Sequence, residues 1–137
     1  MPEQMPEDFG FSVQYGVGQK NEIDTFNGVV IKDLVEDGTA KADITFTDKE
    51  MSEIYEKMKA INVLEEKNFI SKCESEPSEE TEWKITLDGE TVTHSIEEFC
   101  DPTKDVEQFL ELQNYVFDKV KNKEAFKKLP KAKGGYD

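Results

Sequence analysis

The chain contains no arginine. All 17 of its basic residues are lysines, against 31 acidic residues, and the formal net charge is −14 over 137 residues. Arginine supplies the planar guanidinium that binds phosphate in a bidentate manner. A strongly acidic protein that lacks this group is repelled by a phosphate backbone, so we expect no direct binding of nucleic acid.

Groups for catalysis are also scarce. The single histidine, His94, is predicted to lie opposite Trp83 on the apolar side of a hairpin, which favours a structural role over that of a reachable base. Gly16-x-Gly18 lacks the third glycine and the following helix of a phosphate-binding loop. Among so many acidic residues no single carboxylate pair indicates a glycosidase. We therefore expect no enzyme activity and no bound cofactor.

Metal-binding patterns are absent from the sequence as well. There is no C-x-x-C, and one histidine cannot complete a zinc site. Residues 74–82 hold five glutamates but lack the alternating ligands and central glycine of a calcium loop. The two cysteines, Cys73 and Cys100, fall near the ends of predicted strands. They would form a disulfide in an oxidising compartment and remain two thiols in a reducing one, and the sequence leaves both alternatives open.

No window holds the roughly 18 apolar residues that a membrane span needs. The start, Met1–Gly10, is acidic and contains proline, unlike a secretory signal peptide. We expect a soluble protein whose residues 1–8 form a disordered leader. Its compartment stays open, since a cell-surface location would follow if an anchor were removed before this numbering begins.

The clearest local pattern runs from Thr47 to Ile61. Thr47 and Glu50 have the T-x-x-E spacing of a capping box, in which each side chain accepts a hydrogen bond from the backbone N–H of the other residue. Apolar residues then recur at helical spacing, with charged residues between them. We predict a helix with one buried stripe, formed by Met51, Ile54, Tyr55, Met58 and Ile61.

The segments before this helix read as strands. Phe9–Tyr15 alternates apolar and polar residues, and Thr39–Phe46 does the same. Glu22–Leu34 is rich in β-forming residues but irregular, and Asn27–Gly28 within it fits a hairpin turn or a bulge. We favour one long strand with a bulge, because a hairpin would mix apolar and charged residues on both faces.

After the helix we expect a short strand at Phe69–Cys73 and a mobile acidic loop over residues 74–82. Trp83–Ile96 is predicted to form a hairpin with a two-residue turn at Asp88–Gly89. In that register Leu87 faces Glu90, Ile85 faces Val92, and Trp83 faces His94.

A second helix is predicted over Thr103–Val120, with Asp101 as its N-cap and Pro102 as its first residue. We expect it to break near Asn122 and to resume through Phe126, and residues 131–137 to form a flexible tail. Its buried stripe is predicted to contain Val106, Phe109, Leu110, Val116, Phe117 and Val120.

Together these elements predict one α+β domain over residues 9–130, with a mostly antiparallel sheet and two helices packed on one face. A strand-rich piece followed by a helix occurs twice, which raises the hypothesis of a duplicated β-β-β-α unit.

Several segments resemble those of a known family: Asp8–Gly18, Asp24–Gly28, Lys32–Asp33, the helix around Glu50–Met58, and the ending Lys128–Tyr136. Together they resemble an uncharacterised family of small α+β domains from Gram-positive bacteria, some of whose members look like secreted lipoproteins. The resemblance implies no assigned activity. Members of the lipoprotein kind would have a signal and an anchoring cysteine, and neither stands at the start of this sequence.

The charge is unevenly distributed. Residues 119–137 hold seven lysines against two acids, a net of +5, whereas residues 1–118 hold ten lysines against 29 acids, a net of −19. We infer a non-catalytic binding or inhibitory module that acts through contacts with an unknown protein partner. One alternative is an acidic decoy that mimics nucleic acid and blocks a basic protein. A further alternative is a cell-envelope domain of lipoprotein type whose lysine tail contacts anionic lipid.

Overall fold

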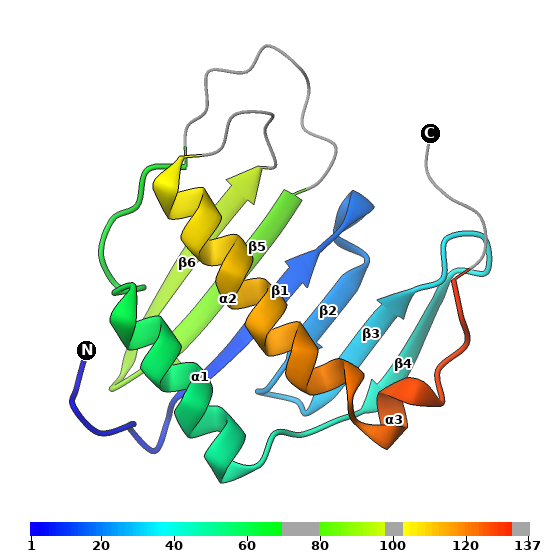
Figure 1. The fold of residues 1–137 in the computed structure, drawn as a ribbon, viewed down its shortest axis with the longest axis horizontal. Helices are drawn as coiled ribbons and strands as arrows, with labels where there is room; N and C mark the ends of the chain where they lie inside the picture. Colours follow the sequence, from blue (N-terminus) through cyan, green and yellow to red (C-terminus); the bar gives the residue numbers. More distant parts are fainter. Residues whose placement is uncertain (70–79, 98–102, 133–137) are drawn as a thin grey trace.

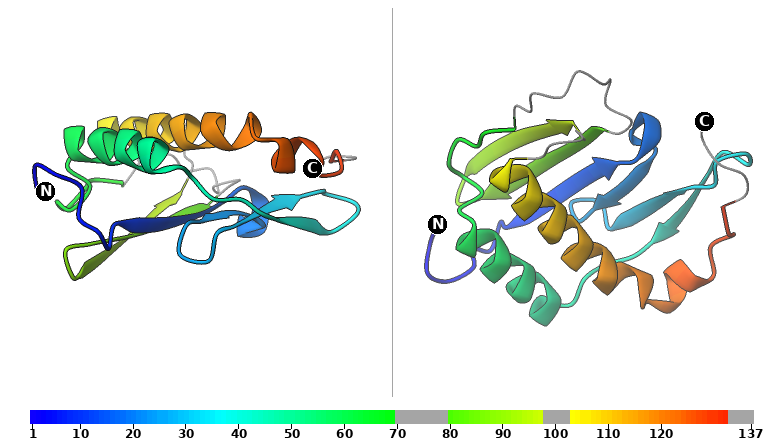
Figure 2. Two further views of the ribbon diagram at one scale, coloured as in Figure 1. Left: turned by 90° about the horizontal axis from the view of Figure 1, so that it is seen from below. Right: turned by 45° about the horizontal axis from the view of Figure 1, so that its top comes forward.

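The structure is a computed structural model that describes residues 1–69, 80–97 and 103–132. These residues form two layers, a six-stranded antiparallel sheet and two long helices that both lie on one of its faces (Figures 1 and 2). The strand order across the sheet is β4-β3-β2-β1-β5-β6. The predicted α+β fold, with an antiparallel sheet and helices on one face, is confirmed.

Four strands precede the first long helix, and two described strands lie between it and the second long helix. The described elements therefore do not repeat as two β-β-β-α units.

In none of the described segments is a helix long and apolar enough to cross a membrane. In chain order the elements are β1 (Gly10–Tyr15), a 3₁₀ turn (Val17–Gln19), β2 (Asn21–Asp24), β3 (Val29–Asp33), β4 (Thr39–Asp43), α1 (Asp48–Ala60), β5 (Glu80–Leu87), β6 (Glu90–Glu97), α2 (Lys104–Lys121) and α3 (Glu124–Lys127).

The strands direct alternate side chains to the two faces of the sheet. Phe11 and Val13 of β1 are fully buried beneath the helices, whereas Ser12 and Gln14 point to the other face, which no described helix covers (Figure 2). We call this second face the open face. Strand pairing and alternation assign to it Ser12, Gln14, Glu22, Asp24, Val29, Ile31, the buried Asp33, Thr39, Lys41, Asp43, Glu80, Glu82, Lys84, Thr86, Thr91, Thr93 and Ser95.

The core lies between the sheet and the two long helices. Trp83 of β5 is fully buried, and its ring centroid lies 6.0 Å from that of Phe11 on β1 and 6.1 Å from that of Phe109 on α2. The predicted capping box of α1 is present, with the Glu50 N–H donating to the Thr47 hydroxyl at 3.1 Å and the Thr47 N–H donating to the Glu50 carboxylate at 2.9 Å. From α1, Ile54, Tyr55 and Met58 are buried, while Met51 and Ile61 pack at the margin of the core.

The prediction of one long strand over Glu22–Leu34 is wrong, because the chain reverses between β2 and β3. The Asp24 carboxylate accepts hydrogen bonds from the N–H groups of Phe26 and Asn27 and from the Asn27 side-chain amide, and these bonds hold the turn closed. Gly28 completes the turn at a φ of 65°. The resulting hairpin does mix residue types, since Val29 and Ile31 share the open face with Glu22 and Asp24.

The expected acidic loop also ends earlier than its composition suggested. Glu80, Thr81 and Glu82 belong to β5, where Glu82 pairs with Gln14 of β1 and Thr81 pairs with Ile96 of β6. Both glutamates project from the open face, where carboxylates stay hydrated, so the acidic composition is compatible with a strand. Phe69 lies outside any strand, and the rest of the expected strand at Phe69–Cys73 lies outside the described residues.

The N-cap of the second helix is two residues later than the predicted Asp101. Thr103 is its N-cap, with the Thr103 hydroxyl accepting from the Val106 N–H at 3.2 Å, and Asp101 and Pro102 lie outside the described residues. Leu112 is buried although it was absent from the predicted stripe, because α2 packs against α1 as well as the sheet and so buries a wider face. The predicted break near Asn122 and the resumed helix through Phe126 are confirmed.

Residues 1–8, expected to be a disordered leader, make specific contacts with the domain. The Tyr55 hydroxyl donates to the carbonyl oxygen of Pro2, and Lys59 donates to that of Glu3 at 3.1 Å. Met1 and Met5 pack against the core. These contacts join the segment to the second half of α1, more than 50 positions away in the chain, and its polar composition does not reveal them.

The predicted β5–β6 hairpin and its register are confirmed. Asp88 and Gly89 have φ values of 49° and 77°, the positive pair that a tight two-residue turn requires. Asp8 closes this turn from outside, because its two carboxylate oxygens accept from the N–H groups of Asp88 at 2.7 Å and Gly89 at 2.8 Å. The hydrogen bonds from Gly89 and Asp88 lower the pKa of Asp8 below its usual value of 3.8.

Replacing Asp8 with alanine is therefore expected to lower the Tm at neutral pH. A carboxyl group whose pKa is lower in the folded state stabilises the fold above its unfolded-state pKa, and this stabilisation is lost as pH falls through the folded-state value. The Tm difference between wild type and Asp8→Ala should thus disappear in strong acid, as measured by thermal unfolding. Glu7→Ala is the matched control, and equal Tm values for wild type and Asp8→Ala at neutral pH would contradict the contact.

Candidate functional site

His94 lies in a half-buried aromatic setting beside β5 and α2. Its Nε2 atom is hydrogen-bonded to the carbonyl oxygen of Val63, so Nε2 carries the proton and donates it. Its ring centroid lies 5.6 Å from that of Phe69 and 5.1 Å from that of Phe109, both in edge-on geometry. Among the described residues no carboxylate pairs with the imidazole. This arrangement supports a packing role for His94.

The described residues contain no group of three or more histidine, cysteine or acidic side chains placed to hold a metal ion. Cys73 and Cys100, the pair for which the sequence left a disulfide open, both lie outside the described residues. The site residues considered from the sequence are thus not brought together in the part of the chain that the structure describes.

The lysine-rich end of the chain is largely paired within the helical layer. Lys123 contacts Glu50 at 2.8 Å and Lys119 contacts Glu53 at 3.3 Å, which ties α2 and the segment after it to α1. Burial alone would raise the pKa of Glu50, but the hydrogen bonds from Lys123 and Thr47 outweigh it and the pKa is lowered. Further along, Lys121 pairs with Asp118 and Lys127 with Glu124 at helical spacing.

The open face has the opposite character. The ion pairs seen among the described residues join side chains of the helical layer, the N-terminal segment or the loop after α1, and the acids Glu22, Asp24, Asp43, Glu80 and Glu82 take part in none of them. This face carries two lysines, Lys41 and Lys84. Its acidic side chains outnumber them and include Glu22, Asp24, Asp43, Glu80 and Glu82. These five acids against two lysines leave a net of −3, so part of the chain's negative charge stands uncompensated on the side of the sheet away from the helices.

One aromatic ring stands at the margin of this acidic surface. Phe26 is 46% exposed, and it is the large hydrophobic residue that the described part of the chain leaves most open to solvent. Its ring lies over Gly10, where an added Cβ would come within 2.8 Å of the Phe26 ring. Because Asp24 fixes the turn by three hydrogen bonds, Phe26 is held in place at little cost in conformational entropy on binding.

The acidic face and Phe26 form the candidate binding surface. Sequence reasoning missed Phe26 because it placed this residue inside a long strand. The signal that could have found it is Asp24 followed by Asn27–Gly28, since an aspartate capping an Asn-Gly turn predicts a tight reversal with the residue between them displayed.

Comparison with protein-family models and with curated proteins finds no match to this chain. The family resemblance noted from the sequence therefore stays a prediction.

His94→Phe is expected to lower the free energy of unfolding by about 1 kcal/mol, because the Val63 carbonyl loses its hydrogen-bond donor while the aromatic packing is kept. Urea denaturation measures the change. Thr93→Val, at the neighbouring exposed position on the open face, is the matched control and should leave stability almost unchanged. An unaltered unfolding midpoint for His94→Phe would contradict a stabilising role for the hydrogen bond from His94 to the Val63 carbonyl.

Proposed function

We propose that this protein is a non-catalytic binding module that docks a basic protein through the open face of its sheet. The observation that carries the proposal is the separation of charge between the two layers. Lysines of the helical layer pair with acids of the same layer, whereas the ion pairs seen in the described residues include none of the open-face acids Glu22, Asp24, Asp43, Glu80 and Glu82. A partner rich in lysine or arginine would supply the missing countercharge.

The composition of the open face supports recognition through polar contacts with a partner surface. A row of paired positions across the centre of the sheet reads Ile31, Glu22, Gln14, Glu82 and Ser95, and the adjacent row reads Val29, Asp24, Ser12, Lys84 and Thr93. Carboxylates alternate with short hydroxyl and amide groups, which donate and accept hydrogen bonds at a wet interface. Phe26 adds a rigid ring against which a partner's cationic group can stack.

Two of the other functions considered from the sequence receive less support. A nucleic-acid decoy needs an unbroken array of carboxylates, and on this face Lys41, Lys84 and several hydroxyl residues interrupt the acids. A lysine tail that contacts anionic lipid needs free ammonium groups, whereas four of the six lysines that the structure describes in residues 119–132, namely Lys119, Lys121, Lys123 and Lys127, are in ion pairs.

The test compares two double variants with the same change in net charge. Glu22→Lys with Glu82→Lys alters the open face, and Glu66→Lys with Glu111→Lys alters exposed acids elsewhere. Wild type and both double variants are immobilised as bait for a lysate of the native host. Proteins retained by wild type and by the Glu66→Lys, Glu111→Lys variant, but not by the open-face variant, are then purified. We expect such a protein to be basic and to bind the open-face variant at least about tenfold more weakly by calorimetry.

Binding should also weaken as salt is raised, because the charges of an exposed face are screened. Phe26→Ala is expected to reduce affinity while leaving the Tm of the protein nearly unchanged. Competition by a DNA duplex for the same partner would indicate the decoy function instead. Equal retention of all partners by both double variants, or no retention by either, would overturn the proposal.

A further inference from the structure

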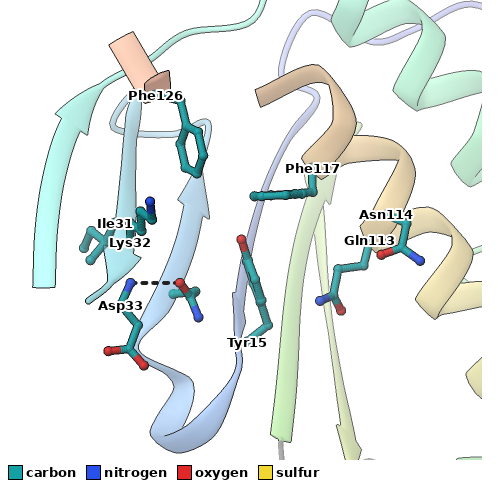
Figure 3. Close-up of a pocket in the computed structure, with 9 residues that line it drawn as sticks. Tyr15, Ile31, Lys32, Asp33, Gln113, Asn114, Phe117 and Phe126 are labelled. Atoms are coloured by element: carbon teal, nitrogen blue, oxygen red, sulfur yellow. Dashed lines mark hydrogen bonds between the residues drawn. The ribbon is translucent and has the colours of Figure 1, made fainter. Parts of the chain in front are cut away.

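A hollow of about 190 Å³ lies on the helical side of the sheet, beneath the second half of α2 and beside α3. Its lining includes neither Phe26 nor the acids Glu22, Asp24, Asp43, Glu80 and Glu82, although Ile31 of β3 borders it. Figure 3 shows Tyr15 of β1 at its centre, with Phe117 of α2 on one side and Phe126 of α3 and Lys32 of β3 toward the other. A cavity of about 150 Å³ is large enough for a benzene ring, so this one accommodates a single ring with short substituents.

The apolar walls of the hollow are aromatic. The ring centroids of Phe117 and Phe126 lie 5.6 Å apart and nearly perpendicular, and the Tyr15 ring meets the Phe117 ring edge-on at 6.5 Å. Rings arranged in this way present both faces and edges to the hollow, which suits an aromatic guest.

One wall carries a hydrogen-bond acceptor without a partner. The Oε1 atom of Gln113, on α2, is buried and receives no hydrogen bond within the described residues. Buried amide oxygens in folded proteins are almost always bonded. Gln113 extends toward Tyr15 from the side opposite Lys32 (Figure 3), so a guest in the hollow that carries an O–H or N–H could donate to it.

The opposite side carries donors suited to an anion. The Lys32 ammonium donates to the carbonyl oxygen of Pro130 at 2.9 Å and lies 5.4 Å from the centre of the Phe126 ring, which leaves it further N–H groups to donate. Asn21 accepts from the Asp33 N–H through Oδ1 at 2.9 Å, which fixes its amide with the NH₂ group still available. Burial raises the pKa of Tyr15 to about 12, so its hydroxyl stays protonated and can donate.

The acid nearest to these donors does not oppose them. Asp33 contributes to the lining, but its carboxylate points away from Tyr15 (Figure 3) and accepts a hydrogen bond from the Val35 N–H at 2.9 Å. The cationic and neutral donors therefore line the hollow, while the Asp33 carboxylate is hydrogen-bonded to the backbone.

We propose that this hollow binds a small single-ring organic acid that also carries a hydroxyl or amino donor. The ring packs against Phe117 and Phe126, the carboxylate binds Lys32 with support from Tyr15 and Asn21, and the donor meets Gln113. The site is independent of the open face, so it stands or falls separately from docking of a basic protein.

The experiment titrates the ¹⁵N-labelled full chain with 4-hydroxybenzoate and follows backbone amide shifts by NMR. Two further probes each lack one group, namely benzoate, without the donor, and 4-hydroxybenzyl alcohol, without the charge. We expect saturable shifts centred on β1–β3 and the second half of α2, with 4-hydroxybenzoate binding about tenfold more tightly than either of the other two.

Variants assign the contacts. Lys32→Met should weaken the binding of 4-hydroxybenzoate about tenfold and leave the affinity for 4-hydroxybenzyl alcohol unchanged. Gln113→Leu should weaken the binding of 4-hydroxybenzoate but not that of benzoate. Lys57→Met is the matched control, since Lys57 also lies over a ring, that of Tyr115 at 5.0 Å, but outside the hollow. Its affinity for 4-hydroxybenzoate should equal that of wild type.

Absence of saturable shifts with 4-hydroxybenzoate, or shifts centred elsewhere, would overturn the proposal. Equal affinity of the wild-type protein for all three probes would do the same, and this comparison decides the question even if a variant fails to fold. No partner protein is needed in this experiment, so its outcome does not depend on the function proposed for the open face.

Discussion

The contact of Trp83 with Phe11 and Phe109 joins the two layers of this protein. Phe11 and Trp83 come from neighbouring central strands and Phe109 from α2, so one aromatic group spans the seam between β1 and β5 and the interface with the helix. All three side chains are almost completely buried. Large aromatic rings contribute much of the apolar area that a small domain can bury. Because this packing is one-sided, it leaves the other face of the sheet to polar residues.

One-sided packing also explains why the charges separate. In the helical layer, lysines and acids that flank the core are brought close enough to pair, as Lys123 and Glu50 are. On the open face, the neighbours of each acid across the sheet are mostly hydroxyl, amide or aliphatic residues, set by strand register. The acids of the open face therefore remain unneutralised by neighbouring lysines and carry part of the net charge of −14. This is what favours a basic partner and gives the open face its place in the proposed function.

Much of the fold could be predicted from local signals. The capping box at Thr47 and Glu50 and the Asp88–Gly89 turn each act over a few residues, and both formed where expected. The turn at Asp24 was missed because hydrogen bonds from the backbone to the Asp24 side chain stabilise it, whereas the prediction relied on the pattern of apolar residues. The burial of Leu112 was missed because it depends on packing against a second helix. The candidate sites were less accessible still. Lys32 and Gln113 stand far apart in sequence, and only the packing of α2 across the sheet brings them to one hollow.

The strand order has a consequence for how the chain folds. The β1–β4 meander and the β5–β6 hairpin each pair neighbouring segments, whereas β1 and β5 pair residues as distant as Val13 and Trp83. Closing so long a loop costs chain entropy before the contacts it brings can compensate. We expect the two local units to acquire structure early and their junction to form in the rate-limiting step, so substitutions at that junction should slow refolding more than they speed unfolding.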